Sequence, residues 1–191
     1  MIMAHVDSLL LSIWIGLGLF WLAGTAFTKR TARAQPVGAR LLHLAFVLPG
    51  YLLLVSNRLA IGWLGERFVP AAPWAAIAGL AVTIAGCLLA AWARLTLGAN
   101  WSGRVTLKEG HELITTGPYA LARHPIYTGL ITAAGGTALA IGEWRGMVGV
   151  ALVAFAFLTK IRQEEPLMLQ AFPDAYPEYR RRVKKLIPGI L

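Results

Sequence analysis

The sequence predicts an all-α integral membrane protein with about five transmembrane helices. Of its 191 residues, 57% are hydrophobic and only 14% are charged, against about 25% charged residues in an average soluble domain. The apolar residues form long runs, and the charged residues gather between these runs. Length alone permits either one compact domain or one small membrane bundle. The distribution of charged residues favours the membrane bundle.

Five apolar runs define the expected helices: residues 8–28, 41–56, 74–93, 126–141 and 146–159. The first run is free of charge, and about 20 helical residues match a bilayer core of about 30 Å. The fourth and fifth runs are shorter and are separated by a four-letter connection, GEWR. We therefore expect the last two helices to form a short hairpin that follows a three-helix membrane scaffold.

The basic residues predict the orientation of the chain. Lys and Arg are concentrated in the loop after the first run, in the 94–125 loop and in the C-terminal tail, whereas the opposite side has Arg58, Arg67 and Arg145. By the positive-inside rule, the tail and the 94–125 loop are cytoplasmic and the N-terminus is outside. A basic rim that faces anionic membrane lipids accounts for the net charge of +9, so we expect no nucleic-acid partner.

Cysteine and histidine indicate neither a disulfide nor a metal site. The single cysteine, Cys87, lies in an apolar run, where a thiol is expected to be inert. The four histidines show no metal-ligand spacing: His5, His43, His111 and His124.

Polar residues that a membrane scaffold does not need lie in residues 97–129 and 160–188. In the first segment, residues 105–107 and 112–115 are expected to be extended, and a short helix is expected over 119–123. No glycine-rich phosphate loop follows a predicted strand, which excludes a dinucleotide-binding domain. The neighbouring glycines Gly135 and Gly136 fall inside an apolar run and indicate close helix packing instead.

A cluster of polar residues is predicted at the start of the fourth helix. Pro125 suits the first helical position, and it pushes the residue before it out of the α region. Arg123 and His124 then lie just outside the positive end of the helix, with Tyr127 in its first turn. Together with backbone N–H groups they form an expected anion-attracting corner. Alternatively, Tyr127 is an ordinary interfacial tyrosine and Arg123 extends to lipid phosphate.

Two carboxylates, Glu164 and Glu165, follow the fifth helix in this interpretation. Because a hairpin brings its two ends together, this pair is expected beside Arg123 and His124. The resulting site has an anion-binding half and a cation-binding half, which suits a zwitterionic ligand. The alternative is that the two glutamates pair within their own helix with Lys160 and Arg162.

The order and spacing of these motifs resemble the isoprenylcysteine carboxyl methyltransferase family, including its short prokaryotic forms, which are related to phospholipid N-methyltransferases. The matching motifs are His111-x-Leu113-Ile114-Thr115-x-Gly117-Pro118-Tyr119, Arg123-His124-Pro125-x-Tyr127-x-Gly129 and Glu164-Glu165-Pro166-Leu167. The resemblance covers roughly the C-terminal half of the chain. It implies a scaffold at residues 1–93 and a catalytic region at 94–191, with a cytoplasmic cofactor-binding loop, the helical hairpin and an amphipathic C-terminal segment.

The resemblance implies S-adenosyl-L-methionine as methyl donor and no metal. The implied cofactor-binding residues are His111, Leu113, Ile114, Gly117, Tyr119, His124, Pro125, Tyr127 and Glu164. Lys160 stands where the family often has a substrate-binding arginine; it keeps the charge but loses the bidentate fork. Arg123 is expected to contact substrate, and Arg123 and Glu165 are the catalytic candidates.

The implied substrate is lipophilic, either a small molecule or a lipidated protein, and the implied location is a bacterial inner membrane. Carboxyl O-methylation of an isoprenylcysteine-like acceptor is the first expectation; a carboxylate needs no base, and Arg123 or Lys160 orients it. Methylation of a lipid amine is the alternative, with Glu165 as the base. The chain departs from the eukaryotic enzymes in having fewer apolar segments, and it has Pro173 where glycine is usual.

Two other interpretations of the function remain open. Sterol-reductase-like membrane proteins, which use NADPH, carry an Arg-His-x-x-Tyr element comparable to Arg123, His124 and Tyr127. A non-catalytic membrane protein is the other possibility, although it leaves residues 97–129 without a purpose.

Overall fold

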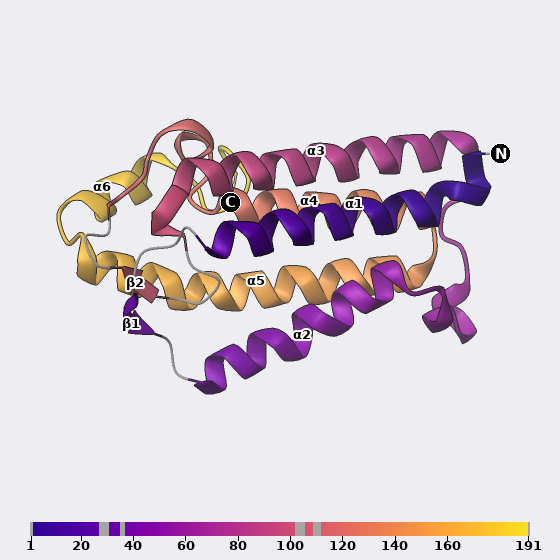
Figure 1. The fold of residues 1–191 in the computed structure, drawn as a ribbon, viewed down its shortest axis with the longest axis horizontal. Helices are drawn as coiled ribbons and strands as arrows, with labels where there is room; N and C mark the ends of the chain where they lie inside the picture. The colour runs from indigo at the N-terminus through magenta and orange to yellow at the C-terminus, as the bar shows by residue number, and fades with distance from the viewer. Residues whose placement is uncertain (1, 27–30, 35–36, 102–105, 109–111, 191) are drawn as a thin grey trace.

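The computed structural model describes residues 2–26, 31–34, 37–101, 106–108 and 112–190. Its helices are α1 (Ile2–Thr25), α2 (Val37–Val55), α3 (Pro73–Leu97), α4 (Pro125–Ile141), α5 (Trp144–Ala171) and α6 (Ala175–Arg182). Helices α1 to α5 lie along one long axis, and consecutive helices run in opposite directions (Figure 1). As a result, the end of α3, the start of α4, the end of α5 and α6 meet at one end of the bundle.

Four helices, α1, α2, α3 and α5, are long and apolar enough to cross a membrane, and α4 is a shorter apolar helix. The prediction of a short second helix in the hairpin is wrong, because α5 is long. This helix has 28 residues and is about 42 Å long, and it continues well past the expected end at residue 159. The prediction ended the helix where charged residues begin, but Lys160 and Glu165 are buried against other elements instead of leaving the bundle.

A short ribbon and a 3₁₀ turn replace some of the expected loop structure. Strand β1 (Thr31–Ala34) pairs antiparallel with β2 (Thr106–Lys108) and so joins two connections that lie far apart in the sequence. Of the two expected extended stretches, the first overlaps β2, whereas residues 112–115 belong to no helix or strand. The short helix expected over 119–123 is instead a 3₁₀ turn, η4 (Gly117–Ala120).

Helices α3 and α4 form the tightest seam of the bundle, because small residues let their backbones approach. A Cβ atom added at Gly136 would collide with the backbone of Thr83, and one at Gly86 would collide with Ala133. Thr83 and Thr137 face each other inside this seam with their hydroxyl oxygens 3.3 Å apart. The predicted packing role is thus confirmed for Gly136, whereas Gly135 meets no atom within 4 Å.

A buried arginine fixes the opposite end of the bundle. Arg145, at the start of α5, is 2% exposed, and its Nε donates to Glu143 at 2.6 Å. Its Nη2 donates to Asn57 at 2.9 Å, and the Asn57 amide donates to Asp7 of α1 at 2.8 Å. These contacts fix the positions of α1, α5 and the segment after α2 relative to one another.

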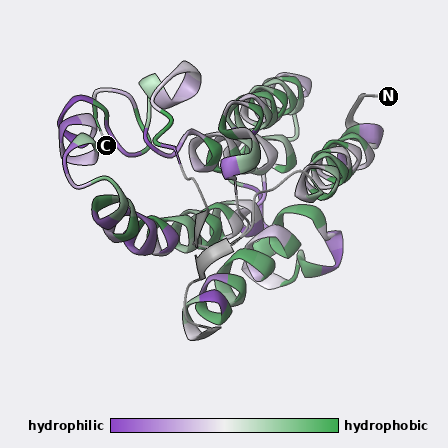
Figure 2. Ribbon diagram, turned by 60° about the vertical axis from the view of Figure 1, so that its left-hand side comes forward, coloured by the Kyte–Doolittle hydropathy of each residue, from purple (hydrophilic) through white to green (hydrophobic). Residues whose placement is uncertain are grey.

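The hydropathy of the surface matches a membrane bundle. Hydrophobic residues cover the long helices, whereas hydrophilic residues gather around α6 and the adjoining end of α5 (Figure 2). Large apolar side chains point outward on α1, α2 and α3, for example Leu22 at 68%, Leu41 at 61% and Leu88 at 64% exposure. These faces are suited to contact lipid tails.

The seam predicts opposite outcomes for two neighbouring glycines. Gly136→Ala forces the α3 and α4 backbones apart and is expected to destabilise the fold by about 1–3 kcal/mol. Gly135→Ala points into open space and is expected to be neutral or slightly stabilising, since alanine favours a helix. The Tm of each variant can be measured by thermal unfolding in detergent, with a thiol-reactive dye that labels the buried Cys87 as it becomes exposed. Equal Tm values for the two variants would contradict close packing at this seam.

Candidate functional site

Helix α4 begins at the residue that the sequence predicts. Pro125 occupies the first helical position, and His124 is the N-cap residue, whose backbone lies outside the α region (φ −125°, ψ 59°). The ring of a proline excludes the α conformation from the residue before it. Arg123 and His124 therefore leave the helix and are directed toward the end of α5.

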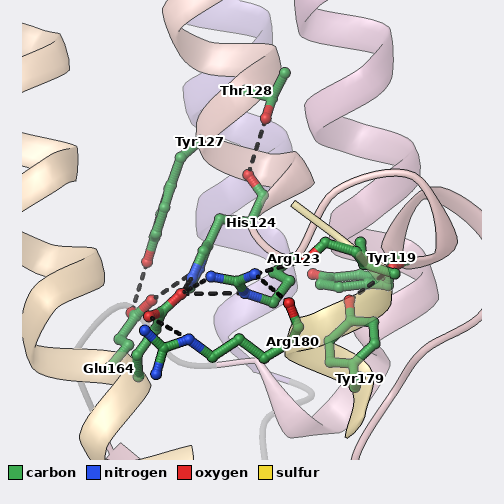
Figure 3. A network of polar contacts seen from close by, with 10 residues as sticks. Tyr119, Arg123, His124, Tyr127, Thr128, Glu164, Tyr179 and Arg180 are labelled. Atoms are coloured by element: carbon green, nitrogen blue, oxygen red, sulfur yellow. Dashed lines mark hydrogen bonds and ion pairs between the residues drawn. The ribbon is translucent and has the colours of Figure 1, made fainter. Parts of the chain in front are cut away.

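Arg123 and Glu165 form a buried ion pair (Figure 3 shows Arg123). The Nε and Nη2 atoms of Arg123 donate to Oε1 of Glu165 at 3.1 Å and 2.5 Å. The two side chains are 4% and 9% exposed, and Nε of Arg180 from α6 lies 3.8 Å from the other carboxylate oxygen. Glu165 thus pairs across elements with residues outside α5, and not with Arg162 of its own helix as the alternative interpretation had it.

The C-terminal residues 183–186, which we call the C-terminal strap, close the same corner. The Nη1 atom of Arg123 donates to the carbonyl of Val183 at 2.6 Å. The backbone N–H groups of Arg123 and His124 donate to the carbonyls of Lys184 and Lys185 at 2.8 Å and 2.9 Å. The anion-attracting corner expected from the sequence is therefore already filled by oxygen atoms of the protein.

His124, Tyr127 and Glu164 form the second half of the site (Figure 3). The Tyr127 hydroxyl donates to Glu164 at 2.6 Å, and Nδ1 of His124 lies 3.5 Å from the other Glu164 oxygen. The rings of His124 and Tyr127 are stacked, with centroids 5.6 Å apart. Within the described residues, Nε2 of His124 is buried and has no hydrogen-bond partner. Glu165 lies 3.6 Å from it, which is too far for a good hydrogen bond.

The charges around His124 favour its protonated form. Burial, the largest single influence, lowers the pKa of His124, but the carboxylates of Glu164 and Glu165 together raise it above its ordinary value of 6.5. In α6, burial raises the pKa of Tyr179 to about 12, an effect that Arg123 partly opposes. The Tyr179 hydroxyl therefore stays protonated at neutral pH. It donates a hydrogen bond to the carbonyl of Tyr119 at 2.6 Å.

Several further predicted residues pack around this half. The Lys160 ammonium lies 5.4 Å from the centroid of the Tyr127 ring, and Lys160 is 9% exposed. Ile114 and Tyr119 pack in the same apolar cluster as Tyr127, and Leu113 beside them is half-buried.

The turn that precedes this cluster begins at Gly117, whose φ of +57° suits glycine. The structure thus brings together the predicted residues of the 113–127 and 160–165 segments. His111, which the resemblance also implies, lies outside the described residues.

Two residues of the site were not predicted from the sequence. Phe157 of α5 stacks on Tyr127 with centroids 4.7 Å apart. It lies three residues before Lys160 and seven before Glu164, a helical spacing that places all three on one face, so the pattern contained a usable signal. Arg180 had no such signal, because its contact with Glu165 depends on how α6 folds back.

The site combines buried cations and carboxylates around a few partly exposed polar atoms. The positive groups (Arg123, protonated His124 and Arg180) directly contact the negative ones (Glu164 and Glu165). A ligand with one charge would disturb this balance, whereas a zwitterion would not. In the described part of the chain, no group of His, Cys, Asp and Glu has an arrangement that could hold a metal ion.

Known proteins match the part of the chain that contains this site. A model of the "Isoprenylcysteine carboxyl methyltransferase (ICMT) family" matches residues 78–170. The chain is 31% identical over 120 residues to a protein-S-isoprenylcysteine O-methyltransferase of Xenopus laevis, covering 61% of this chain and 42% of that protein. It is 30% identical over 120 residues to protein-S-isoprenylcysteine O-methyltransferase B of Arabidopsis thaliana, covering 61% of each.

A third similar protein has a name of another kind. The chain is 32% identical over 119 residues to the nickel-cobalt-cadmium resistance protein NccN of Alcaligenes xylosoxydans xylosoxydans, covering 61% of this chain and 53% of that protein. The match spans about half the length of these three relatives. Together with the four span-length helices, the family match identifies an integral membrane protein.

The buried ion pair predicts a strong effect of one substitution. Glu165→Gln leaves the Arg123 guanidinium buried without its counter-charge, which is expected to cost about 3–5 kcal/mol. The Tm in detergent should fall by at least about 6 °C. Glu178→Gln is the matched control: its partner Arg182 and Glu178 itself are 69% and 59% exposed, so the change is expected to stay within about 1 kcal/mol. Equal Tm values for the two variants would refute a stabilising role of the buried pair.

The raised pKa of His124 predicts how stability depends on pH. The protonated ring contributes its full stabilisation below pH 6.5, the ordinary pKa, and this contribution is lost as the pH rises through the raised value. We expect the Tm of the wild type to fall on going from about pH 6 into the alkaline range. His124→Gln should show a smaller fall, whereas the exposed His5→Gln should follow the wild type. Parallel pH profiles for wild type and His124→Gln would count against the protonated ring.

Proposed function

We propose that this chain is a member of the isoprenylcysteine carboxyl methyltransferase family, whose model matches residues 78–170, and that it is a membrane-bound methyltransferase that uses S-adenosylmethionine. Its proposed reaction is carboxyl O-methylation of an isoprenylcysteine-like acceptor. The observation that supports this function best is the meeting of His124, Tyr127 and Glu164 within the matched region, where the buried Nε2 of His124 makes no hydrogen bond among the described residues and lies 3.6 Å from Glu165. A buried polar atom without a partner is unfavourable and marks a place where a ligand adds the missing contact.

The residues at this place fit S-adenosylmethionine. The donor has a zwitterionic methionine end, which His124 and Glu164 bind in our proposal. It also has an apolar face, for which Leu113, Ile114 and the ring of Tyr119 are available. His111, Gly117, Pro125 and Tyr127 complete the proposed set of cofactor-binding residues. When bound, the donor supplies a methyl group activated by a positively charged sulfur.

The contacts of Glu165 favour a carboxylate acceptor over an amine. A general base must have a free oxygen within reach of the proton that it removes. Oε1 of Glu165 already accepts two hydrogen bonds from Arg123, and Arg180 lies near Oε2. A carboxylate acceptor is ionised at neutral pH and needs no such base. Positioning and exclusion of water then provide most of the rate enhancement.

Arg123 and Glu165 act in this proposal as positioning residues, because their contacts fix His124 and the C-terminal strap. Lys160 is the proposed substrate-binding cation, since its ammonium lies close to Tyr127. The catalytic region is residues 94–191, supported by the scaffold of residues 1–93.

We also propose an orientation in the membrane. The site end of the bundle is cytoplasmic and the N-terminus is outside, as the positive-inside rule favours. The exposed cations of α6 and the strap, which include Arg181, Arg182 and Lys184, then face anionic lipid headgroups. The proposed location is a bacterial inner membrane. A lipophilic acceptor reaches the site from the bilayer, and the donor reaches it from the cytoplasm.

Binding of S-adenosylhomocysteine, the demethylated product of the donor, tests the site. We expect calorimetry on detergent-purified protein to detect binding, and Tyr127→Phe and Glu164→Gln each to weaken it about tenfold, because each removes a charge-assisted hydrogen bond. Tyr51→Phe is the control, since the Tyr51 ring packs against Trp14 of α1 and Tyr51 is not among the proposed binding residues. Transfer of labelled methyl to an N-acetylated S-prenylcysteine tests the acceptor.

Three results would count against this function or its site. Binding of NADPH in place of S-adenosylhomocysteine would place the protein with the membrane reductases. Wild-type affinity in both site variants would place the donor elsewhere. Methyl transfer to a lipid amine but not to the prenylcysteine would overturn the carboxylate acceptor while keeping the donor site.

A further inference from the structure

A histidine outside the matched region lies next to the site. His43 is a half-buried residue in the first half of α2. Its ring packs against Phe157 with centroids 5.6 Å apart. Phe157 stacks on Tyr127, and Tyr127 stacks on His124. Four rings thus form a continuous column from the start of α4, across α5, to α2.

The contact of His43 with α5 defines the role of each ring nitrogen. Nδ1 lies 3.1 Å from the carbonyl oxygen of Ala156. A carbonyl oxygen can only accept a hydrogen bond, so Nδ1 must carry a proton and donate it. Nε2 is then the nitrogen left to contact a ligand. Among the described residues, the structure records no hydrogen bond to it.

The surroundings of His43 match the side from which a lipophilic acceptor arrives. Its neighbours Leu41 and Leu42 are 61% and 47% exposed, so this face of α2 meets lipid. His43 contacts Ala156 and Phe157 of α5, and Lys160 follows these two residues by one helical turn. His43 therefore lies between an apolar surface and the charged half of the site. An acceptor with a prenyl chain and a carboxylate has the same two parts.

We propose that His43 is a further substrate-binding residue, which holds the carboxylate of the acceptor together with Lys160. This inference rests on the proposed function and names the group that selects the acceptor. In its doubly protonated form, His43 donates through Nδ1 to Ala156 and through Nε2 to the carboxylate. Burial of the ring and the Lys160 ammonium both disfavour that form, so the negative charge of the bound carboxylate is what stabilises it in this proposal. The two cations hold the anionic head, while the chain lies along the outer face of α2.

Two amide variants separate this role from a purely structural one. In His43→Asn, the amide nitrogen takes the place of Nδ1 and keeps the bond to Ala156, but nothing replaces Nε2. In His43→Gln, the longer amide reaches the place of Nε2 and gives up the bond to Ala156. We expect both variants to bind S-adenosylhomocysteine as the wild type does. The KM for the N-acetylated S-prenylcysteine should rise about tenfold in His43→Asn, with little change in kcat, and Gln should restore part of the loss.

A binding measurement without turnover sharpens the test. The prenylcysteine acid and its neutral carboxamide are titrated separately against each protein. The wild type should prefer the acid, and His43→Asn should bind both with similar affinity, while its Tm stays at the wild-type value. An unchanged preference for the acid in His43→Asn would overturn the proposal. Equal losses of Tm and of S-adenosylhomocysteine affinity in both variants would overturn it as well, because they would assign His43 a structural role.

The wild type separates failure of this inference from failure of the proposed function. If the wild type binds S-adenosylhomocysteine and methylates the prenylcysteine while His43→Asn behaves identically, only the role of His43 is lost. If the wild type binds no S-adenosylhomocysteine, the methyltransferase function itself is refuted, and the role of His43 with it. If the wild type binds S-adenosylhomocysteine but leaves the prenylcysteine unmethylated, the carboxylate acceptor and the role of His43 are both overturned.

Discussion

The buried pair of Arg123 and Glu165 is the interaction on which the site depends. It joins the start of α4 to the last turns of α5, and the remaining nitrogen of Arg123 binds the C-terminal strap. A charge in surroundings of low polarity is tolerated only when it is paired and hydrogen-bonded. Either residue alone would therefore be unfavourable where it lies. Because they meet, three separate parts of the chain are held together around His124.

Local chemistry made much of this corner predictable from the sequence. Pro125 determines where α4 begins, and a helical hairpin must bring its two ends together, so the meeting of Arg123 and His124 with the two glutamates followed from the order of residues. The length of α5 did not follow. A run of charged residues normally marks the end of a membrane helix. The helix continues because these glutamates have distant partners: Glu165 pairs with Arg123 and Arg180, and Glu164 contacts His124 and Tyr127.

The predicted anion site and the role of α2 show a second limit. The sequence indicates that Arg123 and backbone N–H groups are present, but not that carbonyls of Val183, Lys184 and Lys185 occupy them. His43 carries no spacing signal, since its partner is a backbone carbonyl of another helix. The glycine seam had a pattern, yet the pattern alone does not distinguish Gly136, which touches α3, from Gly135, which does not. Contacts that depend on the rotation of a helix about its axis, or on backbone atoms, are difficult to predict from the amino-acid sequence.

The C-terminal strap has a consequence for how the protein is made. Residues 183–186 supply carbonyl groups to Arg123, to His124 and to Thr128 of α4, yet a ribosome adds them after helices α1 to α5. The helices can enter the bilayer while the strap is still inside the exit tunnel. Until it emerges, the polar groups before α4 must be satisfied by water or lipid headgroups. Assembly of the site is therefore a late event in synthesis, which comes after membrane insertion and not with it.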